Sequence, residues 1–307
     1  MNKILHLILI SLFSITFISC AKKSSDDSKT TTSSGVYVAV GDNGTILTAS
    51  DGTTWTSRTS GTTKDLDGIT YGNSTFVSVG DNGTILTASD GTTWTSRTSG
   101  TTKDLEGITY GISTFVSVGE SGTILTSSDA NTWTTITSGT TKDLEGITYG
   151  NSTFVSVGES GTILTSSDAN TWTTITSGTT RNLHRMTYGN STFVLVGESG
   201  TILTSSDGTS WDNKTSGTTE TLNGVTYENS IFVTVGESGT ILTSSDATTW
   251  TPRTSGVSTF LDGITYGNST FVSVGESGTI LTSSDATSWD NATTPTSSDL
   301  YKVTFSE

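Results

Sequence analysis

The hydrophobic and polar positions of the chain repeat with a fixed period from residue 35 onward. One unit, residues 65–103, reads DLDGITYGNSTFVSVGDNGTILTASDGTTWTSRTSGTTK. Its apolar and β-branched residues alternate with polar ones in short runs, which predicts four β-strands per unit. The predicted strands are residues 66–71, 75–79, 84–87 and 92–98.

Turn-forming pairs separate the four predicted strands. They are Gly72-Asn73, Asn82-Gly83 and Asp90-Gly91. Asn82-Gly83 suits a type I′ hairpin, because both residues accept positive φ. The unit is therefore expected to fold as a meander of antiparallel strands.

The tryptophans show that the period is 39 residues. Successive tryptophans are 39 residues apart throughout, and the chain has no others. Repeats of about 20–50 residues are typical of solenoids, propellers and arrays, and four strands in about 40 residues is the spacing of a propeller blade. The tryptophans are Trp55, Trp94, Trp133, Trp172, Trp211, Trp250 and Trp289.

The two ends of the repeat region complement each other. Residues 35–307 hold seven units, but the first unit begins at its second strand, since 36–41 matches 75–80. The missing first strand follows the last unit, where 300–305 matches 66–71. We therefore predict an all-β, seven-bladed β-propeller with four antiparallel strands per blade, whose first blade is closed by the C-terminal strand. An open solenoid would need distinct caps instead.

The first 34 residues differ in composition from the repeats. Lys3 precedes an apolar run, 4–18, that is too short to span a bilayer comfortably, so residues 1–19 are predicted to be an export signal. Ser19-Cys20 resembles the lipobox of bacterial lipoproteins, which implies lipidation of Cys20 (palmitate included) and a membrane anchor at the outer membrane or cell surface. Residues 20–34 would then be the acylated cysteine and a flexible tether. An ordinary secreted protein is the alternative.

Each unit carries the pattern Ser/Thr-x-Ser-Asp-x-x-x-Trp, as in 126–133. It resembles the Asp-box (bacterial neuraminidase, BNR) repeat of sialidases and of many non-enzymatic propellers. The whole unit also resembles photosystem II stability-factor-like and kelch-like propellers, and these resemblances imply the propeller fold. The aspartates are Asp51, Asp90, Asp129, Asp168, Asp207, Asp246 and Asp285.

We expect structural roles for these aspartates and tryptophans. Each carboxylate would accept backbone N–H bonds in the hairpin between the third and fourth strands. Each tryptophan would pack between adjacent blades, so Trp172→Ala would cost about 3–5 kcal/mol of stability.

The chain is acidic but only lightly charged. Its net charge is −15 with 14% charged residues, which argues against nucleic-acid binding. The single cysteine excludes a disulfide framework and a multi-cysteine zinc site. We expect no metal site and no cofactor, since no metal-ligand spacing is present.

Acidic residues recur in the turn between the second and third strands. In a propeller this turn shares a face with the loop leading into the innermost strand, so an acidic rim is predicted. It could steer basic partners or weakly gather Ca²⁺, and a solvated rim is the alternative. The turn residues are Asp42, Asp81, Glu120, Glu159, Glu198, Glu237 and Glu276. Asp65, Asp67, Asp104, Glu106, Asp143, Glu145 and Asp262 are expected on the same face.

The fifth unit departs from the repeat. It reads RNLHRM at 181–186 where the fourth unit reads KDLEGI. Arg185 and Lys302 occupy a position that is glycine in the five other units. If the first strand lines the channel, these cations would form an anion-binding spot there, and drift within a duplicated array is the alternative. The candidate binding residues are Arg181, His184, Arg185, Tyr301 and Lys302.

These features favour a non-enzymatic, lipid-anchored binding or assembly scaffold of the cell envelope, monomeric, with a protein or glycan partner. A sialidase-like hydrolase is one alternative, but it needs a convergent arginine triad. Arg58, Arg97 and Arg253 are predicted on outermost strands, where they cannot converge. Beyond the export signal the chain has one histidine, His184, which disfavours a catalytic triad or a histidine-rich metal site. A surface-exposed structural or antigenic array without a specific ligand is the other alternative.

Overall fold

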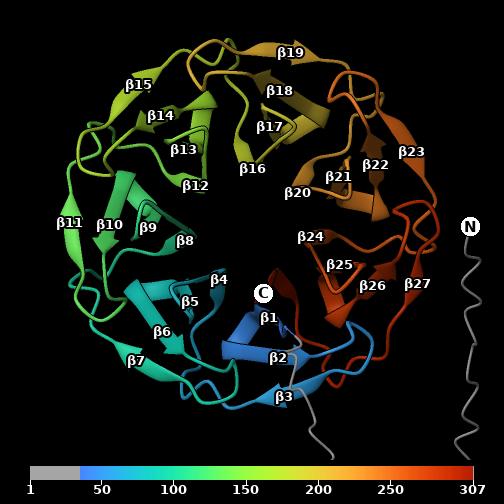
Figure 1. Cartoon of the computed structure of the whole chain (residues 1–307), viewed down its shortest axis with the longest axis horizontal. Helices are drawn as coiled ribbons and strands as arrows, with labels where there is room; N and C mark the ends of the chain where they lie inside the picture. The colour runs from blue at the N-terminus through green and yellow to red at the C-terminus, as the bar shows by residue number, and fades with distance from the viewer. Residues whose placement is uncertain (1–34, 307) are drawn as a thin grey trace, which may run out of the picture. The chain divides into compact units, whose positions relative to one another are not determined.

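The strands of each unit pair into one sheet, and seven such sheets surround a central axis. The computed structural model describes residues 35–306 (Figure 1). Each sheet has four antiparallel strands, so the predicted seven-bladed propeller is confirmed. Blade 1 is β28-β1-β2-β3, and blades 2 to 7 are β4–β7, β8–β11, β12–β15, β16–β19, β20–β23 and β24–β27.

The innermost strand of each blade has six or seven residues and the outermost two or three. The innermost strands are β4 (Leu66–Gly72), β8 (Leu105–Gly111), β12 (Leu144–Gly150), β16 (Leu183–Gly189), β20 (Leu222–Glu228), β24 (Leu261–Gly267) and β28 (Leu300–Phe305). The second strands are β1 (Tyr37–Gly41), β5 (Thr75–Gly80), β9 (Thr114–Gly119), β13 (Thr153–Gly158), β17 (Thr192–Gly197), β21 (Ile231–Gly236) and β25 (Thr270–Gly275).

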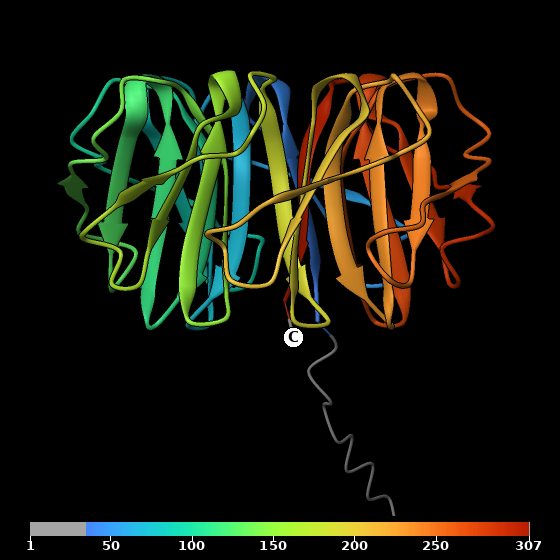
Figure 2. The ribbon, with the colours of Figure 1, turned by 90° about the horizontal axis from the view of Figure 1, so that it is seen from above.

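The third strands are β2 (Thr45–Ala49), β6 (Thr84–Ala88), β10 (Thr123–Ser127), β14 (Ile163–Ser166), β18 (Thr201–Ser205), β22 (Ile241–Ser244) and β26 (Ile280–Ser283). The outermost strands are β3 (Thr56–Arg58), β7 (Thr95–Arg97), β11 (Thr134–Ile136), β15 (Thr173–Ile175), β19 (Asp212–Lys214), β23 (Thr251–Arg253) and β27 (Asp290–Asn291). The inner strands of the blades run between two faces of the ring (Figure 2).

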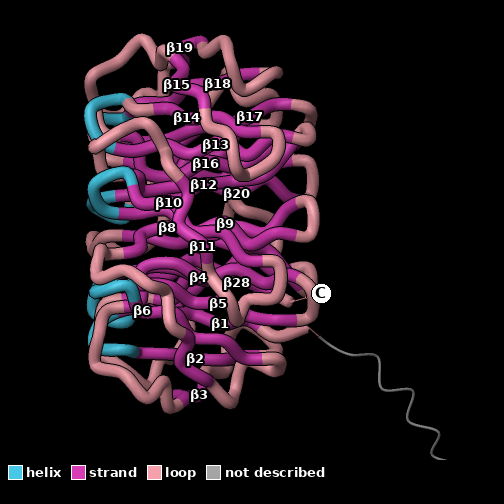
Figure 3. The backbone as a smooth tube through the Cα atoms, turned by 90° about the vertical axis from the view of Figure 1, so that its left-hand side faces the viewer, coloured by secondary structure: helices cyan, strands magenta, loops and turns pink. Residues whose placement is uncertain are grey.

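A one-turn 3₁₀ segment joins the second strand to the third in every blade. These segments are η1 (Asp42–Gly44), η2 (Asp81–Gly83), η3 (Glu120–Gly122), η4 (Glu159–Gly161), η5 (Glu198–Gly200), η6 (Glu237–Gly239) and η7 (Glu276–Gly278). They lie along one face, which we call the η face, and the C-terminal end lies at the opposite face (Figure 3). In η2, Asn82 and Gly83 have φ of 53° and 69°, as predicted for this turn.

The first hairpin turn lies one residue later than predicted. Asn73 and Ser74, with φ of 46° and 56°, form the turn, while Gly72 stays in β4 opposite Thr75. Gly72 is needed in the strand because a Cβ there would lie 2.3 Å from the ring of Tyr110 in the next blade. The fourth strand, β7, is also shorter than the predicted residues 92–98. It begins at Thr95, because the turn that Asp90 closes occupies the residues before it.

The recurring aspartate closes the hairpin between the third and fourth strands. Asp51 Oδ1 accepts the N–H groups of Thr53 and Thr54, both at 2.8 Å, and the same pair of bonds occurs in all seven blades. These bonds lower the pKa of Asp51 to about 2. They therefore stabilise the fold above the carboxyl's ordinary pKa and are lost as the pH falls toward 2.

Apolar side chains of two neighbouring blades form each core cluster. Phe76 of blade 2 packs with Val38 and Val40 of blade 1, for example. The aromatic residue at this position is at most 1% exposed in every blade. These residues are Tyr37, Phe76, Phe115, Phe154, Phe193, Phe232 and Phe271.

The tryptophans contact these clusters from their outer edge. Only Trp55 and Trp250 are buried, and the other five are half-buried. The rings of Phe154 and Trp172 are 6.5 Å apart at an angle of 48°. Because part of the Trp172 indole faces solvent, we expect Trp172→Ala to cost less than the ~3–5 kcal/mol of a fully buried side chain.

Blade 1 is completed by both ends of the propeller. In the pairing of β1 with β28, Ala39 lies opposite Val303 and Tyr37 opposite Phe305. Other blades pair a tyrosine on the inner strand with a phenylalanine on the second, and blade 1 exchanges the two. The Tyr37 hydroxyl donates to backbone oxygens of Gly267 and Thr270 in blade 7, which adds hydrogen bonds at the seam.

The predicted export signal, Cys20 and the tether lie outside the described residues. Among residues 35–306, no helix has the length and apolar character needed to cross a membrane.

Candidate functional site

A β-bulge at the start of every inner strand directs one side chain toward the channel mouth at the η face. In blade 2 the pairing shifts between Leu66 and Gly68, so Asp67 is the extra residue, and the other six inner strands shift at the same place. We call the seven extra residues the mouth ring. With Arg185 they line a cavity of 170 Å³. The mouth ring is Asp67, Glu106, Glu145, His184, Asn223, Asp262 and Tyr301.

Arg185 extends from blade 5 across the channel mouth. Its Nη1 donates to the backbone oxygen of Glu145 and, at 2.9 Å, to that of His184. Its Nη2 lies 3.4 Å from the backbone oxygen of Glu106, two blades away. One guanidinium therefore links three neighbouring inner strands.

His184 and Glu145 form a close pair within the mouth ring. The distance from Nδ1 to Oε2 is 2.5 Å, and both side chains are about one-fifth exposed, at 22% and 23%. The second ring nitrogen, Nε2, is buried and has no hydrogen-bond partner among the described residues. The pair ties the inner strands of blades 4 and 5 together.

For the other carboxyl groups of the mouth ring, burial of the charged form outweighs the stabilisation that nearby groups provide. Burial, reinforced by the charges of Glu106 and Asp81, raises the pKa of Asp67 to about 8. Burial also raises the pKa of Glu106, and that of Asp262 to about 6, although Arg185 opposes both shifts. Asp67 therefore carries a proton at neutral pH, and its buried Oδ2 has no hydrogen-bond partner within residues 35–306.

Asp67→Asn is expected to flatten the pH dependence of stability. The folded protein keeps the Asp67 proton up to a pKa of about 8, whereas the unfolded chain loses it near 3.8. Between these values the folded state binds more protons, so the free energy of unfolding of the natural chain falls as the pH rises. Urea titrations at pH 4, 6 and 8 measure the free energy of unfolding of both proteins. The value for the variant minus that for the natural chain should grow with pH. An offset that is the same at all three values would contradict the assignment.

Blade 1 contributes a tyrosine and a lysine to this region. The Tyr301 hydroxyl donates to the Asp42 carboxylate of η1. Burial, reinforced by the Arg185 charge, lowers the pKa of Lys302 to about 7, while Asp262 acts in the opposite direction. Lys302 is half-buried, and its side chain makes no hydrogen bond or ion pair with any described residue.

The structure brings together His184, Arg185 and Tyr301, with Lys302 beside them, but it does not add Arg181. Arg181 Nη1 donates to the Ser199 backbone oxygen at 3.0 Å, and the residue lines two outer hollows instead. The surroundings of these residues disfavour the anion-binding spot expected from the sequence. The carboxyl groups of Asp67, Glu106, Glu145 and Asp262, which the sequence placed on the same face, line the same cavity.

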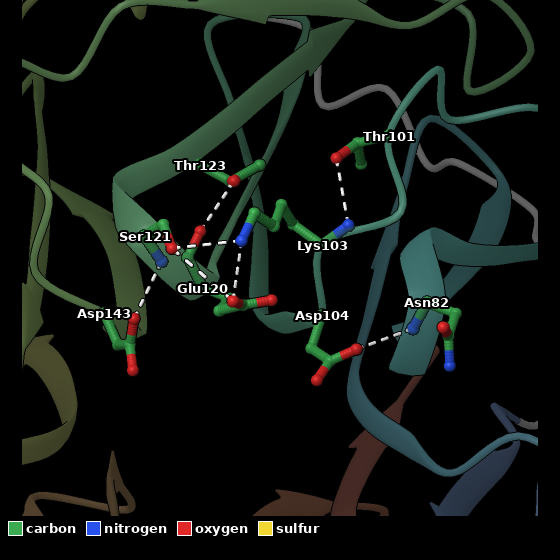
Figure 4. Close-up of polar contacts among 8 residues, drawn as sticks. All are labelled: Asn82, Thr101, Lys103, Asp104, Glu120, Ser121, Thr123 and Asp143. Carbon is green, nitrogen blue, oxygen red and sulfur yellow. Dashed lines mark hydrogen bonds and ion pairs between the residues drawn. The ribbon is translucent and has the colours of Figure 1, made fainter.

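The seven acidic turn residues lie on the η face, as expected, but several have partners. Lys103 Nζ is 2.7 Å from Glu120 Oε1, as Figure 4 shows, and Lys142 Nζ is 2.8 Å from Glu159 Oε1. Among residues 35–306 no group of three or more His, Cys, Asp or Glu side chains could hold a metal ion. The geometry thus gives no support to Ca²⁺ binding at this rim.

Other acidic residues of this face connect adjacent blades. Asp104 Oδ1, before β8, accepts the N–H of Asn82 in the η2 turn of the preceding blade at 2.7 Å (Figure 4). Five blade junctions have this bond, including the one between blades 7 and 1. The acceptors are Asp65, Asp104, Asp143, Asn182 and Asp299.

Asp104→Thr is expected to lower the free energy of unfolding by about 1 kcal/mol. Threonine is the residue at the equivalent position 221, where the Ser199 N–H lacks this acceptor. The reciprocal change Thr221→Asp should raise stability by a similar amount, because it supplies that acceptor. Guanidinium denaturation measures the free energy of unfolding of both variants. A neutral first change together with a destabilising second one would contradict the role of this bond.

A sialidase-type site is not assembled. Arg58, Arg97 and Arg253 end outermost strands, and each donates through Nε to a neighbouring threonine hydroxyl at 2.8 Å. They belong to three different blades and point along their own sheets. The arginine at the channel, Arg185, stands without a second arginine among the residues lining the cavity.

Comparisons with known proteins agree on the fold. No protein-family model matches the chain, and no curated protein matches it. The solved structure of YCF48 bound to D1 peptide is 18% identical with a TM-score of 0.65, and the match covers 80% of this chain and 86% of that one. YCF48 from Cyanidioschyzon merolae is 14% identical with a TM-score of 0.63, covering 78% and 89%. The WD40 propeller domain of Doa1 is 14% identical with a TM-score of 0.65, covering 78% and 85%. These likenesses concern the propeller fold.

Proposed function

We propose that this chain is a non-enzymatic interaction or assembly scaffold that binds a protein partner on its η face. The observation that carries the proposal is the likeness to YCF48, a propeller solved bound to a D1 peptide, over 80% of this chain. The charge pattern supports it, since the η face holds the seven acidic turns and the mouth ring. A scaffold needs a rigid frame, and the closed ring supplies one.

We further propose that the chain is a bacterial lipoprotein of the cell envelope, anchored through Cys20. The described chain begins beside Ser306, because the Ser306 N–H donates to the Val36 oxygen at 3.0 Å. This end lies opposite the η face (Figure 3). A partner on the η face would therefore bind at the face opposite the first described residues. Metabolic labelling with a palmitate analogue is expected to mark the full chain and not the Cys20→Ser variant.

The two most exposed large apolar residues of the described propeller provide a matched test of the face. Phe260 is 46% exposed and lies on the η face, before β24, whereas Ile112 is 48% exposed in the β8–β9 turn of the opposite face. A photo-crosslinking amino acid at position 260 should capture a defined protein from envelopes of the source organism, and one at position 112 should not. Equal capture from both positions, or none from either, would overturn the proposal.

The alternatives predict different outcomes in the same material. A sialidase-like hydrolase would turn over a fluorogenic sialoside, which we expect the purified protein not to do. A glycan-binding scaffold would keep its partner after protease treatment of the envelope fraction. A purely structural or antigenic array would give no crosslink from any position.

A further inference from the structure

Arg185 occupies a position that the fold otherwise reserves for glycine. In five blades the residue after the mouth-ring position is glycine, and Arg185 and Lys302 replace it in blades 5 and 1. The inner strands approach closely there, since a Cβ on Gly146 would lie 2.4 Å from the His184 backbone oxygen. The Arg185 side chain therefore turns into the channel and bonds to strands of blades 3, 4 and 5.

A second position changes together with this one. In the five glycine blades a buried hydroxyl on the second strand donates to the glycine backbone oxygen, at 2.8–3.1 Å. The hydroxyls belong to Ser78, Ser117, Ser156, Thr234 and Ser273. In blade 5 the equivalent residue is Leu195, and in blade 1 it is Ala39. Both blades that carry a cation at the glycine position therefore also lack the hydroxyl.

The surroundings of Arg185 suit a guanidinium in particular. Its planar group has several N–H donors in a fixed fork, which matches acceptors that come from different strands. Here those acceptors are three backbone oxygens, and the carboxyl groups of Asp67, Glu106 and Asp262 face the same charge. The cavity of 170 Å³ beside it has the size of a small group and not of a folded element.

We propose that the channel mouth is a guanidinium-binding site that the chain fills with its own Arg185. Arg185 is then an internal ligand and its contact is autoinhibitory: it keeps the mouth ring closed to outside cations. An arginine side chain of a partner peptide is the external ligand of matching chemistry, and it competes with Arg185 for the same oxygens. This identification of the ligand rests on the proposed function, whereas the internal site does not.

Emptying the site tests the proposal. Arg185→Gly carries the residue of five other blades, and Arg185→Gly/Leu195→Ser restores the complete blade pattern. Calorimetry with N-acetyl-arginine amide and with ethylguanidinium should give saturable one-to-one binding to both variants, at least tenfold tighter than to the natural chain. Ethylguanidinium should also raise the melting temperature of the variants and not of the natural chain. Ethylammonium chloride controls for charge without the fork, and Lys302→Gly is the control for loss of a neighbouring cation.

The outcomes are distinguishable. Equal, weak binding of the guanidinium probes to all variants, or equal responses to ethylammonium and ethylguanidinium, would overturn the guanidinium site. If Arg185→Gly alone proves too unstable, the double variant and Arg185→Gln, which removes the charge and shortens the side chain, allow the same titration. Failure of this experiment leaves the crosslinking at position 260 unaffected, so the proposed function and this inference fail separately.

Discussion

A chain that ends at Asp299 is expected to lose cooperative folding. Removing β28 takes Leu300 and Val303, 0% and 3% exposed, out of the core between blades 7 and 1. Truncation of one buried leucine alone costs about 2–5 kcal/mol, against a total stability of about 5–15 kcal/mol for most domains. The deletion also removes every hydrogen bond between β28 and β1, which leaves β1 as an unpaired edge. Circular dichroism melting should show no sigmoidal transition.

A circular permutant provides the matched control for this truncation. It joins Ser306 to Gly35 by a short linker and opens the chain between Thr63 and Lys64, in the exposed loop before β4. All 28 strands are retained and each blade becomes continuous in sequence, so the melting temperature should stay close to that of the natural chain. A synthetic peptide of residues 297–307 should also restore a transition to the truncated chain. A truncated chain that melts like the natural one would contradict the importance of closure.

Phe154→Ala is expected to lower the free energy of unfolding by about 3–5 kcal/mol. The Phe154 side chain is fully buried, and it packs with Val116, Val118 and Ile124 of blade 3. Its removal leaves a cavity between two sheets that are held apart by the rest of the ring, so collapse cannot fill it. Urea denaturation followed by tryptophan fluorescence measures the loss.

Trp172→Ala in the same blade is the comparison for Phe154→Ala. Trp172 packs against the same cluster but is half-buried, and its indole N–H donates to the Ala169 oxygen at 3.2 Å. We expect a smaller loss, about 1–3 kcal/mol, because less apolar area leaves water in the natural chain. A larger effect at Trp172 than at Phe154 would contradict this ranking of the interblade core.

The channel mouth shows where sequence reasoning reached its limit. Arg185 was recognisable, since it breaks a glycine position within near-identical repeats. An acidic face around it was expected too, but the sequence did not separate Asp67 and Glu106 from Asp65 and Asp104. All four precede or begin an inner strand, and only the bulge decides that Asp67 and Glu106 enter the cavity while Asp65 and Asp104 accept bonds from the neighbouring turn.

The sequence by itself determined the number of blades, the strands per blade and the closure by the C-terminal strand. It could do so because these properties depend on period, alternation and complementary ends, which are all local or countable along the chain. Tertiary structure alone decided how far each tryptophan is buried, which carboxyl groups keep their protons and where Arg185 finds its acceptors. Those outcomes depend on the close approach of neighbouring blades, where burial and charge are set by residues that belong to different repeats.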